Sequence, residues 1–203
     1  MRGKSPKDIL GEQGEEIVQT WLIKQGYHIL MVSRIEEIEG GAPMLKGEDD
    51  KASPPDILAW KEGQPGWVEV KTKSDATKHE QYPHRWEHGF PLRHWEAYLK
   101  VQAQTGIPVT IAVAEAKPPP GRLLIATIKA LAKGKRVSLM DGEMHVFFNR
   151  GKYTGKGKFP QDIGDFQRCE SLLNIGVLIP IPPEAERTKR QPPTPDHGQL
   201  PLF

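Results

Sequence analysis

The sequence predicts an α/β fold in which helices flank a mixed central sheet. Two observations lead to this prediction. The expected elements follow the order helix, strand, hairpin, helix, strand over residues 9–115, and the apolar run 107–114 is typical of a strand that is covered on both faces. A chain of 203 residues, of which 37% are hydrophobic and 27% are charged, can form one such domain with an appendage.

Residues 9–25 are predicted to form an amphipathic helix that Gly26 ends. Apolar side chains recur in it at helical spacing, and two glycines near its start would let it approach the sheet closely. The apolar residues are Ile17, Val18, Trp21 and Leu22, and the glycines are Gly11 and Gly14. Residues 27–32 are then predicted to form a buried strand, and residues 33–54 an exposed loop or flap, because they mix glycine, proline and acidic residues without a period.

Two short β-prone runs, 56–60 and 66–72, are separated by a turn-forming stretch and are predicted to pair as an antiparallel hairpin. A loop rich in histidine and aromatic residues is expected after this hairpin. Residues 79–94 either contact DNA or simply pack, and their role stays open. The spacing of His84 and His88 would suit zinc on a helix, but the neighbouring proline and glycine disfavour that interpretation.

Residues 92–105 are predicted to form a second helix that Gly106 ends, followed by the buried strand 107–114. Beyond a proline-rich break, residues 123–131 are predicted to form another helix, and residues 136–149 one or two strands.

We divide the chain into a domain, residues 1–179, and a proline-rich tail, residues 180–203, which we expect to be flexible and disordered because seven of its residues are proline. Within the domain, the core spans residues 9–115 and a basic extension spans residues 121–179. A single cysteine, and the lack of a long apolar run or an apolar leader, lead us to expect a cytoplasmic protein that does not enter a membrane.

Charge is unevenly distributed, although the net charge is only +2. Residues 129–158 hold eight basic and two acidic residues, whereas residues 36–50 hold six acidic residues and one basic residue. Such segregation predicts a basic face that follows DNA phosphates, with solvated faces that bind no partner as the alternative. The residues expected to contact DNA are Lys73, Lys133, Lys135, Arg136, Arg150 and Lys152.

Two carboxylates and a lysine carry the sharpest chemical signal. Asp56, after Pro55, begins the first strand of the hairpin, and Glu69-Val70-Lys71 lies in the second. Because side chains alternate along a strand, Glu69 and Lys71 share one face, and pairing of the hairpin would bring Asp56 close to them. Hard oxygen ligands beside a lysine predict a magnesium site.

A magnesium or manganese ion at these carboxylates would suit phosphodiester hydrolysis. The ion would lower the pKa of a water and polarise the phosphoryl oxygen, while Lys71 would orient or deprotonate the attacking water. The alternative is that Asp56 only begins a strand and that Glu69 and Lys71 form a surface ion pair. Glu15, on the flank of the apolar stripe of the first helix, either joins this site or offsets the helix dipole.

Five short motifs follow one another along residues 9–115: Gly11-x-x-Gly14-Glu15, Trp21-Leu22, Gly26-Tyr27, Pro55-Asp56 and Glu69-Val70-Lys71. This order resembles the PD-(D/E)xK nuclease superfamily, especially its Holliday-junction-resolvase-like branch. The resemblance implies a restriction-endonuclease-like core with one or two magnesium ions. Its catalytic residues would be Glu15, Asp56, Glu69 and Lys71, of which the three acids would be the metal ligands.

Two further points follow from the resemblance. A glutamine in the second helix recurs near the site in this superfamily, which points to Gln102, one turn from Tyr98. Residues 33–54 are longer than the link that such relatives carry, so the resemblance implies no substrate class.

The last five residues, 199–203, resemble the peptide that docks into the hydrophobic pocket of the bacterial DNA-polymerase sliding clamp. The resemblance implies that Leu202 and Phe203 fill an apolar pocket while Gln199 hydrogen-bonds at its rim. The clamp-binding residues would be Gln199, Leu200, Leu202 and Phe203. The tail would then act as a tether, with a tail that folds back over the core as the alternative.

Together these features predict a magnesium-dependent DNA nuclease that the sliding clamp recruits in repair, recombination or replication, in the nucleoid. Two alternatives stay open: a catalytically inactive adaptor that binds DNA at the clamp, and a restriction-like endonuclease of a phage or mobile element. The sequence also leaves open which DNA structure is cleaved, whether cleavage is internal or terminal, and whether the chain forms a homodimer.

Overall fold

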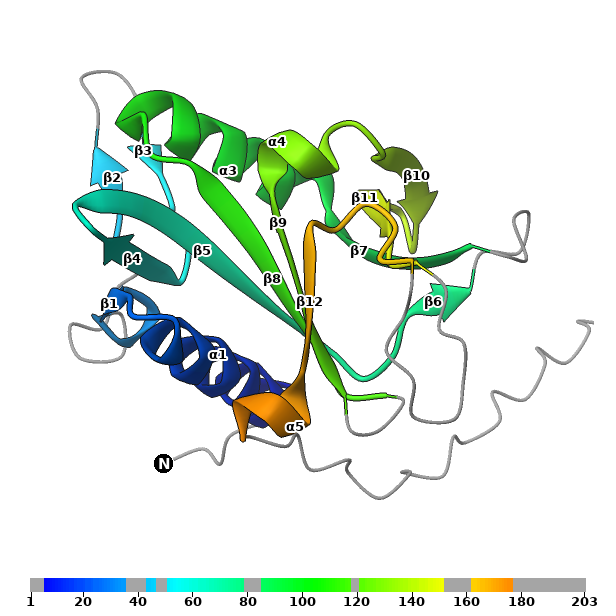
Figure 1. Ribbon diagram of the computed structural model, residues 1–203. Helices are drawn as coiled ribbons and strands as arrows, with labels where there is room; N and C mark the ends of the chain where they lie inside the picture. The colour runs from blue at the N-terminus through cyan, green and yellow to red at the C-terminus, as the bar shows by residue number, and fades with distance from the viewer. Residues whose placement is uncertain are drawn as a thin grey trace, which may run out of the picture.

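The computed structural model describes residues 6–35, 43–46, 51–78, 85–117, 121–151 and 162–176. Its centre is a six-stranded mixed sheet (Figure 1), in which β5 and β8 pair in parallel and the other described neighbours pair antiparallel. The strands, in their order across the sheet, are β1 (His28–Met31), β4 (Ile57–Lys61), β5 (Gln64–Lys73), β8 (Val109–Glu115), β9 (Arg122–Thr127) and β12 (Arg168–Ser171).

Within the described residues, two smaller sheets accompany the central one. The larger of them is antiparallel and contains, in spatial order, β10 (Arg136–Met140), β11 (Glu143–Asn149), β7 (Trp86–Pro91) and β6 (Thr77–Lys78). The other is a single pair, β2 (Leu45–Lys46) with β3 (Lys51–Ala52). The helices are α1 (Pro6–Lys24), α3 (Leu92–Thr105), α4 (Ile128–Leu131) and α5 (Leu172–Ile175), and residues 33–35 are also helical.

The two faces of the central sheet bury different partners, as the alternation along β8 shows. Ile111 and Val113 join one apolar cluster with α3 and the four-stranded sheet, whereas Ala112 and Ala114 join a second cluster with α1. Both faces of β8 are therefore covered, as the apolar run in the sequence predicts. The predicted α/β class, a mixed central sheet flanked by helices, is confirmed.

α1 lies very close to β5 because it carries glycine at the contact. A Cβ built on Gly14 would come within 1.8 Å of Thr72 Oγ1, so no larger residue fits without movement. Gly11 faces open space, which makes the prediction of close approach correct for Gly14 and wrong for Gly11.

Gly14→Ala should therefore lower the free energy of unfolding by roughly 1–3 kcal/mol, the usual cost of overpacking. Gly11→Ala is the matched control, because it adds the same methyl group where nothing lies within 4 Å. It should leave stability unchanged or raise it by up to about 1 kcal/mol through helix propensity. Urea unfolding of the two variants tests this, and equal effects would contradict the packing account.

Several elements lie where short sequence patterns predicted them. The β4–β5 hairpin turns at Glu62 and Gly63, which both have positive φ (53° and 76°), so Pro65 lies inside β5 and not in the turn. α3 spans the predicted residues, and Gly106 ends it in the left-handed conformation (φ 68°). β1 is where it was expected, but it is an edge strand with exposed residues and not a buried strand.

Three predictions are wrong because the deciding partners are distant in sequence. Residues 123–131 do not form one helix: β9 pairs with β8 on one side and β12 on the other, and only α4 is helical. The expected loop 79–94 contains β7, which pairs with β11. The expected loop 33–54 contains β2 and β3, and the side chain of Ala52 is buried against the core. The predicted tail, 180–203, lies outside the described residues.

A buried group of charged residues joins the six-stranded sheet to the four-stranded sheet. Glu115, at the end of β8, is fully buried; its Oε2 lies 2.6 Å from His88 Nε2, and its Oε1 accepts a hydrogen bond from Arg122 at 2.6 Å. Arg150, only 4% exposed, approaches the same carboxylate to 3.2 Å. Arg150 is thus enclosed by the protein and lies against Glu115, surroundings that the prediction of a DNA phosphate contact did not anticipate. No described helix is long and apolar enough to span a membrane.

Candidate active site

A cavity of about 240 Å³ opens between β5, α3 and residues 53–56, which lie just before β4. Its lining includes Asp56, Glu69, Lys71 and Tyr98, so the structure brings together the two carboxylates and the amine that the sequence singled out. β4 pairs with β5 in a register that sets Ile57 opposite Val68, which places Asp56, just before β4, beside the middle of β5. Local strand pairing thus builds this part of the site.

Asp56 is held by the backbone of β5. Its Oδ2 accepts a hydrogen bond from the Val70 N–H at 2.7 Å. Burial, followed by the negative charge of Glu69, raises the pKa of the Asp56 carboxyl from 3.8 to about 7, against the opposing effects of the Val70 N–H and Lys71. The carboxylate therefore carries an electrostatic cost that a nearby cation would relieve.

Glu69 is buried and engaged by two donors. Lys71 Nζ lies 2.5 Å from Glu69 Oε1, and the Tyr98 hydroxyl donates to the same oxygen at 2.6 Å. Burial, and then the charge of Glu69, raise the pKa of the Tyr98 hydroxyl above its ordinary value, so it stays a neutral donor. The Lys71 ammonium also lies over the rings of Phe90 and Tyr98, at 5.9 and 5.8 Å from their centroids.

Glu15 lies beside this cavity and not within its lining. Ser33, which borders the cavity, donates a hydrogen bond from its Oγ to Glu15 Oε2 at 2.8 Å. The charge of Glu15 contributes to the raised pKa of Asp56, which places Glu15 within electrostatic reach of the site. Glu16, the next residue, is exposed.

Two cavity residues on α3 were not assigned to the site from the sequence. His94 and Tyr98 are four residues apart, so they share one face of the helix, and both line the cavity. Burial, and then the charge of Lys71, lower the pKa of His94 and favour its neutral form. Gln102, one turn further on, is not in the site: its Oε1 accepts the N–H of Val109 at the start of β8.

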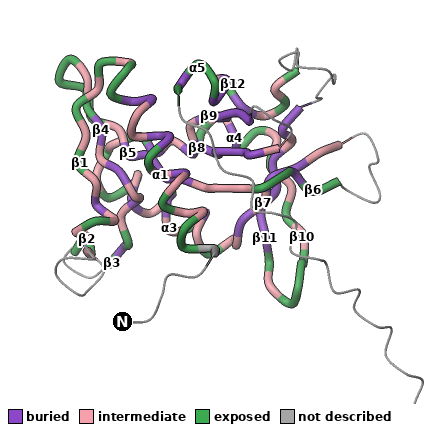
Figure 2. The backbone as a smooth tube through the Cα atoms, turned by 90° about the horizontal axis from the view of Figure 1, so that it is seen from below, coloured by how far each residue is buried: buried purple, intermediate pink, exposed green. Residues whose placement is uncertain are grey.

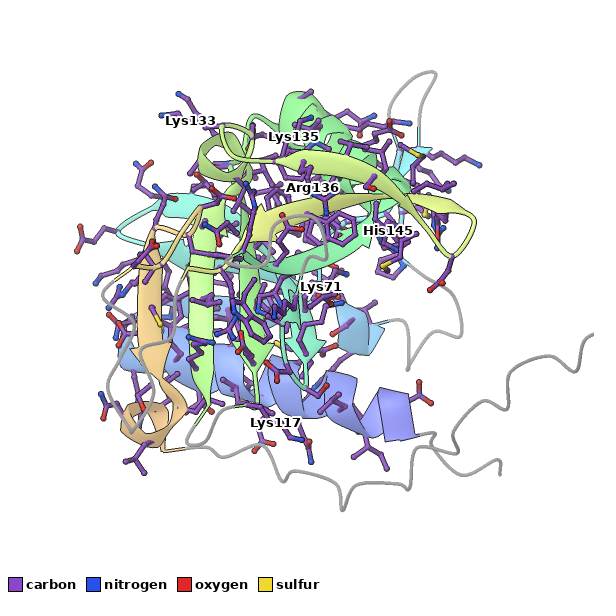
Figure 3. All side chains as sticks on the ribbon, turned by 90° about the vertical axis from the view of Figure 1, so that its right-hand side faces the viewer. Lys71, Lys117, Lys133, Lys135, Arg136 and His145 are labelled. Atoms are coloured by element: carbon purple, nitrogen blue, oxygen red, sulfur yellow. The ribbon has the colours of Figure 1, made fainter. Side chains whose placement is uncertain are left out.

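The predicted DNA contacts have different surroundings. Figure 3 shows Lys133, Lys135 and Arg136 around the start of β10, above Lys71 in that view. Lys133 and Lys135 are exposed, whereas Arg136 is half-buried and donates to Glu87 Oε2 at 2.7 Å. Lys73, two residues from Lys71, is half-buried, and burial lowers its pKa. Lys152 and the clamp-like peptide 199–203 lie outside the described residues.

No family model and no curated protein matches the chain. Among solved structures, the chain is similar to Hjc, a Holliday junction resolvase from the archaeal hyperthermophile Archaeoglobus fulgidus. The two are 14% identical, the match covers 66% of this chain and 81% of that chain, and the TM-score is 0.42. At this TM-score the likeness does not establish a shared fold or a shared activity.

Asp56 should make the metal-free protein less stable as the pH rises. Because folding raises the pKa of this carboxyl from 3.8 to about 7, its stabilising contribution is present below about pH 4 and is lost as the pH rises through 7. In EDTA, Asp56→Asn should raise the Tm by a few degrees at pH 8 and change it little at pH 4. Thermal unfolding at both pH values checks this, and a larger gain at pH 4 would contradict it.

Proposed function

We propose that the chain is a divalent-metal-dependent DNA nuclease with a PD-(D/E)xK-like core, and that it hydrolyses phosphodiester bonds. The observation that supports this most is the meeting of three residues in one cavity: Glu69 and Lys71 from β5, and Asp56 from just before the paired strand β4. Phosphodiester hydrolysis needs positive charge beside the phosphate and an activated water, and this donor set suits both needs.

The donor set fits a hard cation such as Mg²⁺ or Mn²⁺. Among the described residues, no group of three or more acids, histidines or cysteines could hold a metal ion. Magnesium, however, is commonly bound through one or two carboxylates together with waters and substrate phosphates. Asp56 and Glu69 would hold the ion, and Glu15 would lie beside them as a further acid. When bound, the ion would supply a water of lowered pKa and positive charge at the phosphate.

The chain's own residues would position these groups. The Tyr98 hydroxyl and the Lys71 ammonium both engage Glu69 Oε1, which fixes the orientation of that carboxylate. The Val70 N–H does the same for Asp56. With DNA bound, the Lys71 ammonium would orient the attacking water or contact a phosphoryl oxygen, because it already lies at the cavity.

The exposed lysines near β10 supply the proposed backbone contacts. In the view of Figure 3, Lys133 and Lys135 lie above Lys71 and Lys117 lies below it. Binding through such contacts weakens steeply as salt is added. The lysines release counterions that are condensed on the DNA, and this release is less favourable when the salt concentration in solution is higher.

Glu69→Gln is expected to lower the cleavage rate of DNA in magnesium at least 100-fold, because it removes a charged ligand while keeping the side chain's shape. Asp56→Asn should have the same effect. Glu16→Gln is the matched control, because Glu16 is an exposed acid one residue from Glu15, and its cleavage rate should be unchanged. The cleavage rate of Glu15→Gln should lie between that of Glu69→Gln and that of Glu16→Gln.

A panel of linear, nicked, flapped and branched DNA provides the measurement, with circular dichroism to verify folding. Cleavage that persists in folded Glu69→Gln would contradict the proposed nuclease. Tight DNA binding with no cleavage by the unmodified chain would favour the adaptor alternative, in which the same residues only hold DNA.

We also propose that the C-terminal peptide binds the bacterial sliding clamp. Support comes from the sequence: two large apolar residues at the chain end, Leu202 and Phe203, preceded by Gln199, form a pattern suited to an apolar pocket with a polar rim. The clamp would raise the local concentration of the nuclease on DNA, in the nucleoid, without adding a DNA contact.

Replacing both Leu202 and Phe203 with alanine should abolish clamp binding in surface plasmon resonance, because each is a proposed apolar anchor. Pro201→Ala should bind nearly as well as the unmodified chain. Cleavage of naked DNA should be the same for all three proteins. Clamp affinity that survives loss of both anchors would overturn this proposal and leave the nuclease proposal intact.

A further inference from the structure

The β10–β11 hairpin carries apolar side chains into solvent. Figure 2 shows it projecting beyond the rest of the described domain. The exposed fractions are 41% for Val137, 67% for Leu139 and 43% for Met144. We call these three residues the apolar strip. Large apolar side chains gathered on a projecting hairpin are a common mark of a contact surface.

The strip continues the core face of its sheet. Val137 lies opposite the buried Val146, and Leu139 lies opposite Met144. Since side chains alternate along each strand, all four residues belong to one face. Val146 is covered by the core, and the strip is the part of this face that extends beyond it.

This face leads directly to the candidate active site. Val146 lies opposite Phe90 in β7, and the Lys71 ammonium lies 5.9 Å from the centroid of the Phe90 ring. Near the hairpin turn, Glu143 forms an ion pair with Arg93, which immediately precedes the cavity residue His94. Val146 therefore lies between the strip and the ring that Lys71 covers. The ion pair joins the hairpin, near its turn, to the helix that lines the cavity.

The charges around the strip suit a nucleic acid. Lys135 lies just before β10, and its ammonium is 5.4 Å from the centroid of the ring of Trp95, which belongs to the same apolar cluster as Val146. Lys133 is exposed just before it. Glu143 is paired with Arg93, and Asp141 lies in the turn itself. A ligand on this face would meet lysines first and then apolar side chains, which matches phosphates followed by bases.

We propose that the apolar strip is a wedge that contacts unstacked bases beside the cleavage site, with Leu139 and Met144 as specificity-determining residues. The proposal rests on the proposed nuclease function. Apolar side chains inserted at a base step must offset an unstacking cost of a few kcal/mol. That cost is smallest where stacking is already interrupted. The strip would therefore favour DNA with such an interruption over continuous duplex.

Two DNA probes of equal length test the proposal: a fully paired duplex, and one with a three-nucleotide bulge flanked by 2-aminopurine. Affinities are measured by anisotropy with the full chain in EDTA, and unstacking by 2-aminopurine fluorescence. The unmodified chain should bind the bulged probe more tightly. Leu139→Ser combined with Met144→Ser should lower the ratio of the two affinities about tenfold or more and remove the fluorescence change.

Leu173→Ser is the matched control, because Leu173 is 64% exposed but lies on α5, away from the strip. It should leave both readouts unchanged. If the unmodified chain binds and cleaves DNA but the double variant keeps the affinity ratio, the wedge is wrong and the nuclease stands. If the unmodified chain binds neither probe, both the wedge proposal and the nuclease proposal are wrong. Light scattering compares the molar mass of the unmodified chain with that of the double variant. A lower molar mass for the double variant would show that the strip is a contact between copies of the chain, and this would also overturn the wedge.

Discussion

The site depends on holding two carboxylates together in a partly buried cavity. Strand pairing places Asp56 beside Glu69, and burial together with the charge of Glu69 raises the pKa of Asp56 to about 7. Three donors offset this repulsion: the Val70 N–H on Asp56, and Lys71 with Tyr98 on Glu69. The arrangement still costs stability without a cation, which is the compromise that functional sites commonly make.

One strand serves both the core and the site, and that part could be predicted from the sequence. Val68 and Val70 of β5 pack under α1, while Glu69 and Lys71 face the cavity beside α3. The alternation of β5 is a local signal, as are the glycine that ends α3 and the turn before β5. Local signals were therefore sufficient for α1, the β4–β5 hairpin and α3, and for the three central residues of the site.

The rest depends on contacts that no local pattern encodes. The apolar run of β9 fits a helix as well as a strand until β8 and β12 are known to lie on either side of it. Arg150 belongs to a basic stretch in the sequence, but its partner, Glu115, is 35 residues earlier and fully buried. Tyr98 was noticed only for its spacing from Gln102, and its hydrogen bond to Glu69 spans 29 residues.

The most direct measurement is calorimetric titration of the full chain with Mn²⁺, beside Glu69→Gln and the exposed control Glu16→Gln. If Asp56 and Glu69 form a cation site, the unmodified chain and the control should bind with similar affinity, and Glu69→Gln should bind at least tenfold more weakly. Equal binding by all three proteins, or no binding by any, would contradict the account.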